Sequence, residues 1–262
     1  MTETERAESY EAFWDLYVQS VFPQIKAATD PGAERLHWPG DEWGTPEIWQ
    51  KIYEMVFAPE IGPDTVRVVE IGPGAGKYTA MVLDRQPGAR LLAFDVSPAY
   101  LAVMTERLAP AIAAGRLEAI RLEPEWDHLA RAIEARGWGG SVDLLFSIDA
   151  MVHVDLQYLI AYWLCAARVM RPGGRMIMSV ADATSPHGFE KLMADVPTYF
   201  AAQGKVTSKF EWLSPSLVET VLNKIGFDVR FFPKLAGRDC WFVATRRSAT
   251  AASGTDPARS GG

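Results

Sequence analysis

The chain has 262 residues, of which 48% are hydrophobic and 23% are charged. These values are close to the soluble globular average and exclude disorder over the whole length. The net charge of −7 disfavours a general nucleic-acid binder, because phosphate contacts need clustered Lys and Arg. The acidic N-terminus has no apolar signal-peptide core, and the longest uncharged stretch, residues 156–167, is too short to span a bilayer. Because Cys165 and Cys240 form neither a disulfide framework nor a zinc motif, we expect a cytoplasmic protein.

Residues 1–62 are predicted to form a helical cap. Its first helix has aromatic and apolar residues at steps of three or four, an amphipathic pattern. These residues are Tyr10, Phe13, Trp14, Tyr17 and Val21. A loop over residues 37–44 follows, and a second helix is expected from about Pro46, which suits a first helical turn, to Phe57.

From residue 66 short β-branched segments alternate with helical ones. Strands are predicted at 66–71, 91–95, 117–122, 142–147, 175–180, 227–232 and 240–245. Helices are predicted at 77–85, 98–108, 125–135, 156–170 and 215–226. This alternation predicts an α/β fold with a doubly wound, Rossmann-like, mostly parallel sheet. We assign residues 63–247 to this domain, with an insertion at 183–213, and predict that the small polar residues 248–262 form a disordered tail.

The strongest chemical signal is Glu70-Ile71-Gly72-Pro73-Gly74-Ala75-Gly76, which follows a predicted strand and opens a helix. Ligands of doubly wound sheets lie beside such a turn, where glycines let the backbone approach closely. Asp95 ends the next strand, and its carboxylate can accept both hydroxyls of a ribose. A dinucleotide-binding loop reads G-x-G-x-x-G/A, whereas Lys77 holds the last place here. A plain strand–turn–helix and an NAD(P)-dependent oxidoreductase stay open as alternatives.

The spacing E-x-G-x-G-x-G resembles motif I of the class I S-adenosylmethionine (SAM)-dependent methyltransferases. Further stretches resemble this family in the same order along residues 66–245. They are Phe94-Asp95-Val96-Ser97, Leu122-Glu123, Asp143 to Ser147, Val169 to Gly174, and Gly226-Phe227. The resemblance implies a seven-stranded sheet with the last strand antiparallel, and methyl transfer from SAM. Glu123 departs from the commoner Asp, and Pro124 follows it at once.

The resemblance also implies which residues bind SAM. They are Glu70, Gly72, Gly74, Gly76, Asp95, Val96, Glu123 and Ser147. The glycines would line the methionine end, with Glu70 beneath the loop ordering the ammonium group, and Asp95 would bind the ribose. A simpler role for Glu70, as the partner of a helix terminus, stays open.

Candidate catalytic residues follow the fourth predicted strand. The ordinary pKa of histidine, near 6.5, suits His153 for work as a general base. Asp149 can orient a histidine or hold the substrate, and structural roles stay open for both residues. The segment resembles small-molecule O-methyltransferases, including some that act on sugars. It lacks the Asn/Asp-Pro-Pro-Tyr signature of DNA-amine and glutamine-amide methylating members, and Ala183 after Asp182 disfavours the metal site of catechol-type enzymes.

The acceptor pocket is expected between the cap and the insertion, with Trp38, Asp41, Trp43 and His187 as candidate substrate contacts. We therefore predict transfer of a methyl group from SAM to a small molecule, at a hydroxyl of a sugar or natural product, without nucleic acid or membrane as partner. N-methylation of a small amine is the alternative. Aminopropyl transfer from decarboxylated SAM and a non-catalytic SAM-fold subunit are further rivals. The sequence makes no prediction about oligomers.

Overall fold

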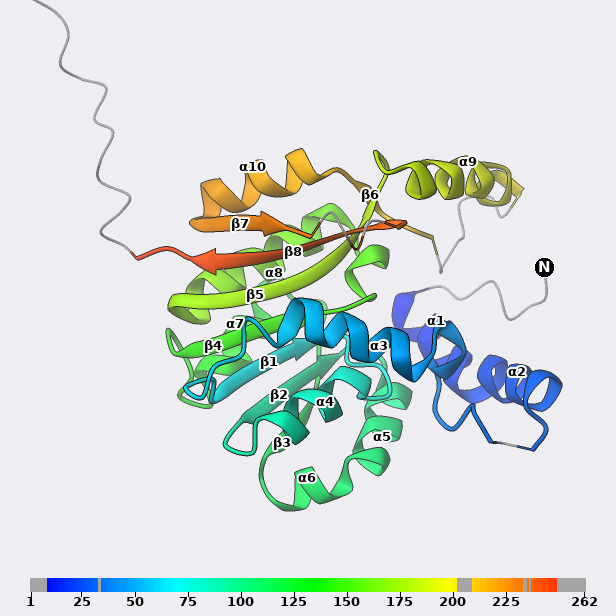
Figure 1. Ribbon diagram of the computed structural model, residues 1–262, viewed down its shortest axis with the longest axis horizontal. Coiled ribbons are helices and arrows are strands. Elements are labelled where there is room, and N and C mark those ends of the chain that lie inside the picture. Colours follow the sequence, from blue (N-terminus) through cyan, green and yellow to red (C-terminus); the bar gives the residue numbers. More distant parts are fainter. Residues whose placement is uncertain (1–8, 33, 202–208, 233–234, 236, 249–262) are drawn as a thin grey trace, which may run out of the picture.

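The computed structural model describes residues 9–32, 34–201, 209–232, 235 and 237–248. The strands of these residues form one sheet in the order β3-β2-β1-β4-β5-β8-β7 (Figure 1). Neighbours from β3 to β5 are parallel, whereas β8 is antiparallel to β5 and β7, so the predicted doubly wound sheet is confirmed. Its strands are β1 Arg67–Ile71, β2 Arg90–Asp95, β3 Leu117–Arg121, β4 Val142–Ser147, β5 Met170–Asp182, β6 Trp212–Leu213, β7 Phe227–Phe231 and β8 Asp239–Arg246.

The prediction of seven strands is wrong by one, because β6 pairs in parallel with the end of β5. This pair forms where the chain returns from the insertion, and two residues are too few for a periodic signal. Strand β5 also begins at Met170 and not at Arg175. The turn predicted at Arg171 to Gly174 lies inside this strand as an irregularity: Met170 pairs with Val142 and Arg175 with Leu144, and Gly173 between them has a φ of 76°.

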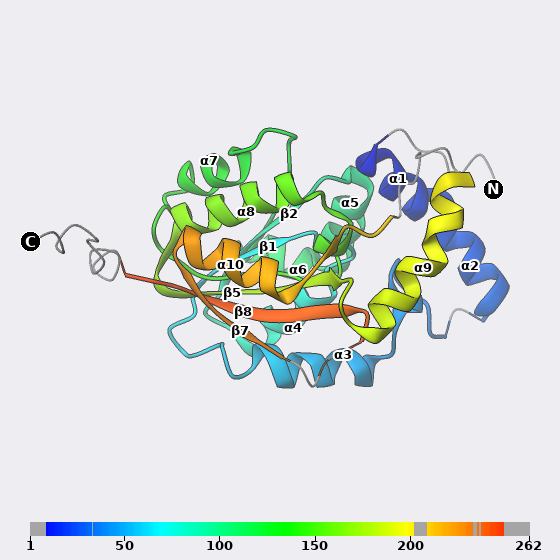
Figure 2. The ribbon, with the colours of Figure 1, turned by 90° about the horizontal axis from the view of Figure 1, so that it is seen from above.

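The helices cover both faces of the sheet. In Figure 2, α7, α8 and α10 lie on one face and α3 and α4 on the other, while α1, α2 and α9 gather at the end where the parallel strands finish. The helices are α1 Tyr10–Leu16, α2 Phe22–Thr29, α3 Pro46–Ile52, α4 Lys77–Arg85, α5 Pro98–Arg107, α6 Ala109–Ala113, α7 His128–Glu134, α8 Leu156–Val169, α9 Pro186–Ala201 and α10 Pro215–Ile225. Within the described ranges, no helix has both the length and the apolar character needed to cross a membrane.

Three of the helices predicted from the sequence begin with a hydroxyl residue followed by proline, and α9, which was not predicted, begins in the same way at Ser185. Thr45, Ser97 and Ser214 each accept a backbone N–H of the first turn, and the next residue is Pro46, Pro98 or Pro215. The hydroxyl satisfies a donor that the helix cannot pair, and proline loses nothing at a position whose N–H is free. The predicted starts of these helices are therefore confirmed.

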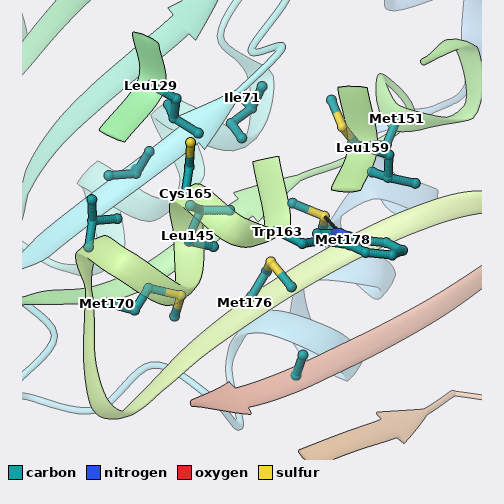
Figure 3. Close-up of a cluster of buried hydrophobic side chains, with 14 of the residues drawn as sticks. Ile71, Leu129, Leu145, Met151, Leu159, Trp163, Cys165, Met170, Met176 and Met178 are labelled. Atoms are coloured by element: carbon teal, nitrogen blue, oxygen red, sulfur yellow. Dashed lines mark hydrogen bonds between the residues drawn. The ribbon is translucent and has the colours of Figure 1, made fainter. Parts of the chain in front are cut away.

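Each face of the sheet carries its own apolar cluster. Figure 3 shows the cluster under α7 and α8, where Trp163 packs beside Met178 and its Nε1 donates to the methionine sulfur at 3.4 Å. On the other face Phe57 stacks on Tyr78 and meets the edge of Phe146. Burial on both faces is what the nearly continuous apolar strand at 142–146 predicts.

The cap helices are fixed to the sheet domain by specific contacts. Asp15 of α1 accepts the Ser97 hydroxyl at 2.6 Å and the Ala99 N–H at 3.0 Å, both at the start of α5. Tyr17 and Tyr100 stack in a third apolar cluster. The cap therefore lies over the carboxyl end of β2. Apart from Ser248, the predicted tail lies outside the described residues.

Candidate active site

A cleft of about 690 Å³ opens at the carboxyl ends of β1, β2 and β4, with the cap forming one wall. The loop after β1, the end of β2 and residues 148–155 after β4 all contribute to it. The β7–β8 connection adds Arg238, a residue that carries no motif and that sequence analysis does not single out. Carboxyl ends of parallel strands meet at one edge of a sheet, which is why these segments converge.

The glycine loop needs glycine for two different reasons. Gly72 and Gly74 line the cleft with φ of 69° and 54°, in the left-handed region. A side chain at Gly72 would collide with the Cβ of Ala150 on the facing loop. Gly76, with φ of 76°, is not among the described residues lining the cleft, and a Cβ there would meet Met104 of α5. Gly72 therefore permits close contact with the loop after β4, whereas Gly76 permits helix packing.

Asp95 is buried at the end of β2 with its carboxylate on the cleft wall. One oxygen accepts the Ser97 N–H at 2.9 Å, and the other accepts the Gly74 N–H at 3.4 Å. Burial raises the pKa of this carboxyl to about 6, although the two backbone hydrogen bonds oppose the rise. Val96 and Glu123 line the same part of the cleft. The Asp95 carboxylate, Val96 and Glu123 therefore all face the same cleft.

Glu70 and Ser147 lie behind the cleft wall. Glu70 is buried and accepts the hydroxyl of Thr79 on α4, while burial raises the pKa of its carboxyl to about 8. This placement corresponds to the simpler role of a helix-terminus partner. The Ser147 hydroxyl donates to the Ile71 carbonyl at 2.6 Å and ties β4 to the start of the glycine loop. Both side chains support the loop from below.

Asp149 lies directly after β4 with φ of 58°, an uncommon value for a residue other than glycine. Its N–H donates to Ser179 Oγ at 2.9 Å, and its carboxylate accepts Arg238 Nη2 at 2.8 Å. Arg238 also donates to Asp239. Among the described contacts Asp149 is therefore joined to Arg238, and none of its hydrogen bonds reaches His153.

His153 lines the cleft with its ring between two aromatic side chains. Its centroid lies 5.4 Å from that of Trp14 and 4.8 Å from that of Phe210. Nδ1 is 3.0 Å from the Lys209 carbonyl oxygen. Because a carbonyl only accepts, the contact places the proton on Nδ1 and leaves Nε2 as an acceptor. Burial lowers the pKa of this imidazole to about 4, so the ring is neutral near pH 7.

The acceptor side of the cleft has an aromatic wall, but its members differ from those expected. Trp43 lines it as predicted, together with Trp49 and Trp241. Trp38 and Asp41 are not among the described lining residues, because the Asp41 carboxylate turns inward to accept the N–H groups of His37 and Trp38.

His187 lies outside the described cleft as well. Its side chain is exposed on α9, 3.6 Å from Glu190. Trp38, Asp41 and His187 are therefore not among the described residues that line the cleft. Within the described ranges, no three His, Cys, Asp or Glu side chains come together to hold a metal ion.

A doubly wound sheet with a glycine loop after β1 and a buried carboxylate at the end of β2 is the architecture of a nucleoside-binding enzyme domain. Residues 69–176 match the family model of the methyltransferase domain. The chain has the fold of the class I SAM-dependent methyltransferases, as its strand order and the solved structures reported below show. SAM is the methyl donor of this class, and the glycine loop and Asp95 fit a nucleoside at the cleft.

Three known proteins illustrate the similarity. Trans-aconitate 2-methyltransferase of Streptomyces avermitilis is 35% identical over 60 residues, which are 23% of this chain and 22% of that protein. An O-methyltransferase family protein from Burkholderia thailandensis superposes with a TM-score of 0.57 at 20% identity, covering 77% of this chain and 57% of that one. Magnesium protoporphyrin IX methyltransferase from Synechocystis PCC 6803, solved with bound SAH, superposes with a TM-score of 0.60 at 15% identity. The superposition covers 88% of this chain and 97% of that one. The chain spans less than two thirds of the first two proteins.

Proposed function

We propose that this protein transfers the methyl group of SAM to a hydroxyl group of a small molecule. The observation that carries the proposal is His153, a neutral imidazole in the cleft lining whose Nδ1 contacts the Lys209 carbonyl, which leaves Nε2 as the acceptor nitrogen. A sulfonium donor already carries its leaving group, so the protein must align the reactants, exclude water and take the hydroxyl proton. His153 supplies the last of these, and the aromatic rings around it exclude water.

The residues at the ends of β1 and β2 hold the donor in this proposal. The Asp95 carboxylate accepts the ribose hydroxyls, and Val96 and Glu123 face the base. Gly72 and Gly74 let the backbone approach the methionine end. When bound, SAM supplies an electrophilic methyl group on a positively charged sulfur.

The aromatic wall that the cap and β8 contribute to the cleft favours an acceptor with a flat apolar ring. Trp43, Ile48, Trp49 and Trp241 line this side, and Trp43 and Ile48 are each 52% exposed. Large apolar side chains left open at a cleft are typical of a binding surface for an organic ligand. A hydroxylated natural product or a glycoside fits this wall. A small amine is the second candidate, because the carboxylates of Asp149, Asp155 and Asp239 also line the cleft.

The test is incubation of the purified chain with SAM and a panel of small hydroxylated and amino compounds, followed by mass spectrometry for an added methylene mass. Methylation of hydroxyl compounds, lost in His153→Gln, supports the proposal. Methylation of amines alone supports the second candidate. If calorimetry shows that the protein binds NAD(P)H and neither SAM nor S-adenosylhomocysteine, both candidates are excluded.

A further inference from the structure

Lys77 opens α4 directly after the third glycine of the loop, and its side chain lines the cleft. Its Nζ donates to the Gly40 carbonyl at 3.0 Å and lies over the Trp49 ring, 3.0 Å from the centroid. An ammonium group carries three donors, so this bond leaves two for other acceptors. The surrounding groups bury it enough to lower the pKa of Lys77 to about 8.

Lys77 differs from the other cation of the cleft wall in its ion pairing. Among its described lining residues, Lys77 and Arg238 are the only lysine and arginine. Arg238 is already bound by the carboxylates of Asp149 and Asp239. Among the described residues no carboxylate forms an ion pair with Lys77, although the charges of Asp41, Glu42 and Asp149 are near enough to raise its pKa against the effect of burial. A partly buried cation without a direct ion-pair partner is costly unless a ligand pairs it.

We infer that Lys77 binds the carboxylate of the methionine end of SAM and so positions the donor. This inference rests on the proposed function. The amino-acid tail of SAM brings a carboxylate into a cleft lined mainly by apolar and acidic groups, and Lys77 is the described lining cation left to pair with it. A charge-assisted hydrogen bond forms only at short distance. Lys77 directly follows the glycine loop, so its side chain starts beside the proposed binding place of the methionine end.

The same ammonium connects the donor to the cap. Gly40 and Trp49 belong to the cap segment that carries the aromatic wall, and both contact Lys77 directly. A carboxylate bound at Nζ would therefore lie beside this wall. Lys77 is thus a positioning residue whose ammonium group would contact both the donor carboxylate and the aromatic wall of the cap.

The test compares two ligands that share a nucleoside. S-adenosylhomocysteine carries the amino-acid tail, and 5′-methylthioadenosine lacks it. By calorimetry, Lys77→Met should weaken S-adenosylhomocysteine at least tenfold and change 5′-methylthioadenosine less than twofold, as expected for loss of a charge-assisted bond. Decarboxylated S-adenosylhomocysteine, which keeps the ammonium group, should bind wild type and variant equally. The exposed Lys51 on α3 provides the matched control, Lys51→Met, which should change none of these affinities.

Three results would overturn the inference. Unchanged affinity of Lys77→Met for S-adenosylhomocysteine would mean that the ammonium does not meet the donor carboxylate and would leave an acidic acceptor as its partner. An equal loss for S-adenosylhomocysteine and 5′-methylthioadenosine would make Lys77 a structural support of the loop. If neither ligand binds the wild-type protein, the proposed function fails together with the inference. If the wild-type protein binds S-adenosylhomocysteine and either of the first two results is found, only the inference fails.

Discussion

The Nδ1 atom of His153 lies 3.0 Å from the carbonyl oxygen of Lys209, a residue at the far end of the insertion. The insertion was expected to line the acceptor pocket. Among its described residues none lines the cleft, yet this contact sets the tautomer of the candidate base. The insertion therefore supports the site through the orientation of one ring.

Replacing this ring should separate catalysis from donor binding. We expect His153→Gln to lower kcat at least 100-fold, the usual range for loss of a general base, while the affinity for S-adenosylhomocysteine changes less than twofold. His187→Gln, on exposed α9, is the control and should keep full activity. Because burial lowers the pKa of His153 to about 4, the ring stays neutral above that value. With SAM at saturating concentration, kcat should therefore persist to about pH 5 and fall below it. A kcat that is already lost near pH 6.5 under saturating SAM would contradict this.

Asp95 should make donor binding depend on pH. Its carboxyl has a pKa raised to about 6 by burial, so it is ionised above pH 6 and protonated below. Since the ionised form is the stronger acceptor for ribose hydroxyls, the affinity for 5′-methylthioadenosine should fall as pH drops from 7.5 to 5. Asp95→Asn should bind at least tenfold more weakly at pH 7.5 and show no such slope. Calorimetry checks both, and equal slopes for the two proteins would exclude Asp95 as the ribose acceptor.

The glycine at position 72 should be intolerant of a side chain. Gly72→Ala adds a Cβ that collides with Ala150 and holds alanine at φ of 69°, so we expect a loss of about 1–3 kcal/mol in unfolding free energy. The control Gly88→Ala has no neighbour within 4 Å and should be nearly neutral. Adding Ala150→Gly to Gly72→Ala should recover part of the loss by removing the collision. Urea unfolding measures all three, and a neutral Gly72→Ala would show that the two loops are not in contact.

Glu70 should make the protein less stable as pH rises. The folded state raises the pKa of this carboxyl from 4.5 to about 8, mainly by burial, so between these values the folded state holds a proton that the unfolded chain releases. Stability that is present below pH 4.5 is then lost as pH rises towards 8. Glu70→Gln removes this dependence. The stability of the variant relative to wild type, measured as the free energy of unfolding, should therefore be larger at pH 8 than at pH 5. A difference that is the same at both pH values would refute the assignment.

Much of the architecture follows from local signals in the sequence. The hydroxyl–proline pairs at the starts of three helices, the β-branched strands and the glycine loop act within a few residues, and all appear where they are predicted. The position of Asp95 at the end of β2 is equally local, so both candidate donor contacts could be found before the structure. The two-residue β6 and the early start of β5 were not predicted from the sequence, because each depends on pairing with a distant strand.

The sequence by itself determined the doubly wound sheet and the carboxylate at position 95, and it carries the motifs that resemble SAM-dependent methyltransferases. Tertiary structure alone decided that Arg238 pairs with Asp149, that Lys77 reaches Gly40, and that Trp43 lines the cleft where Trp38 does not. The physical reason is the range of the interactions. Turn chemistry and hydrophobic periodicity act between neighbours in sequence, whereas the direction of a loop side chain depends on which distant segment packs against it.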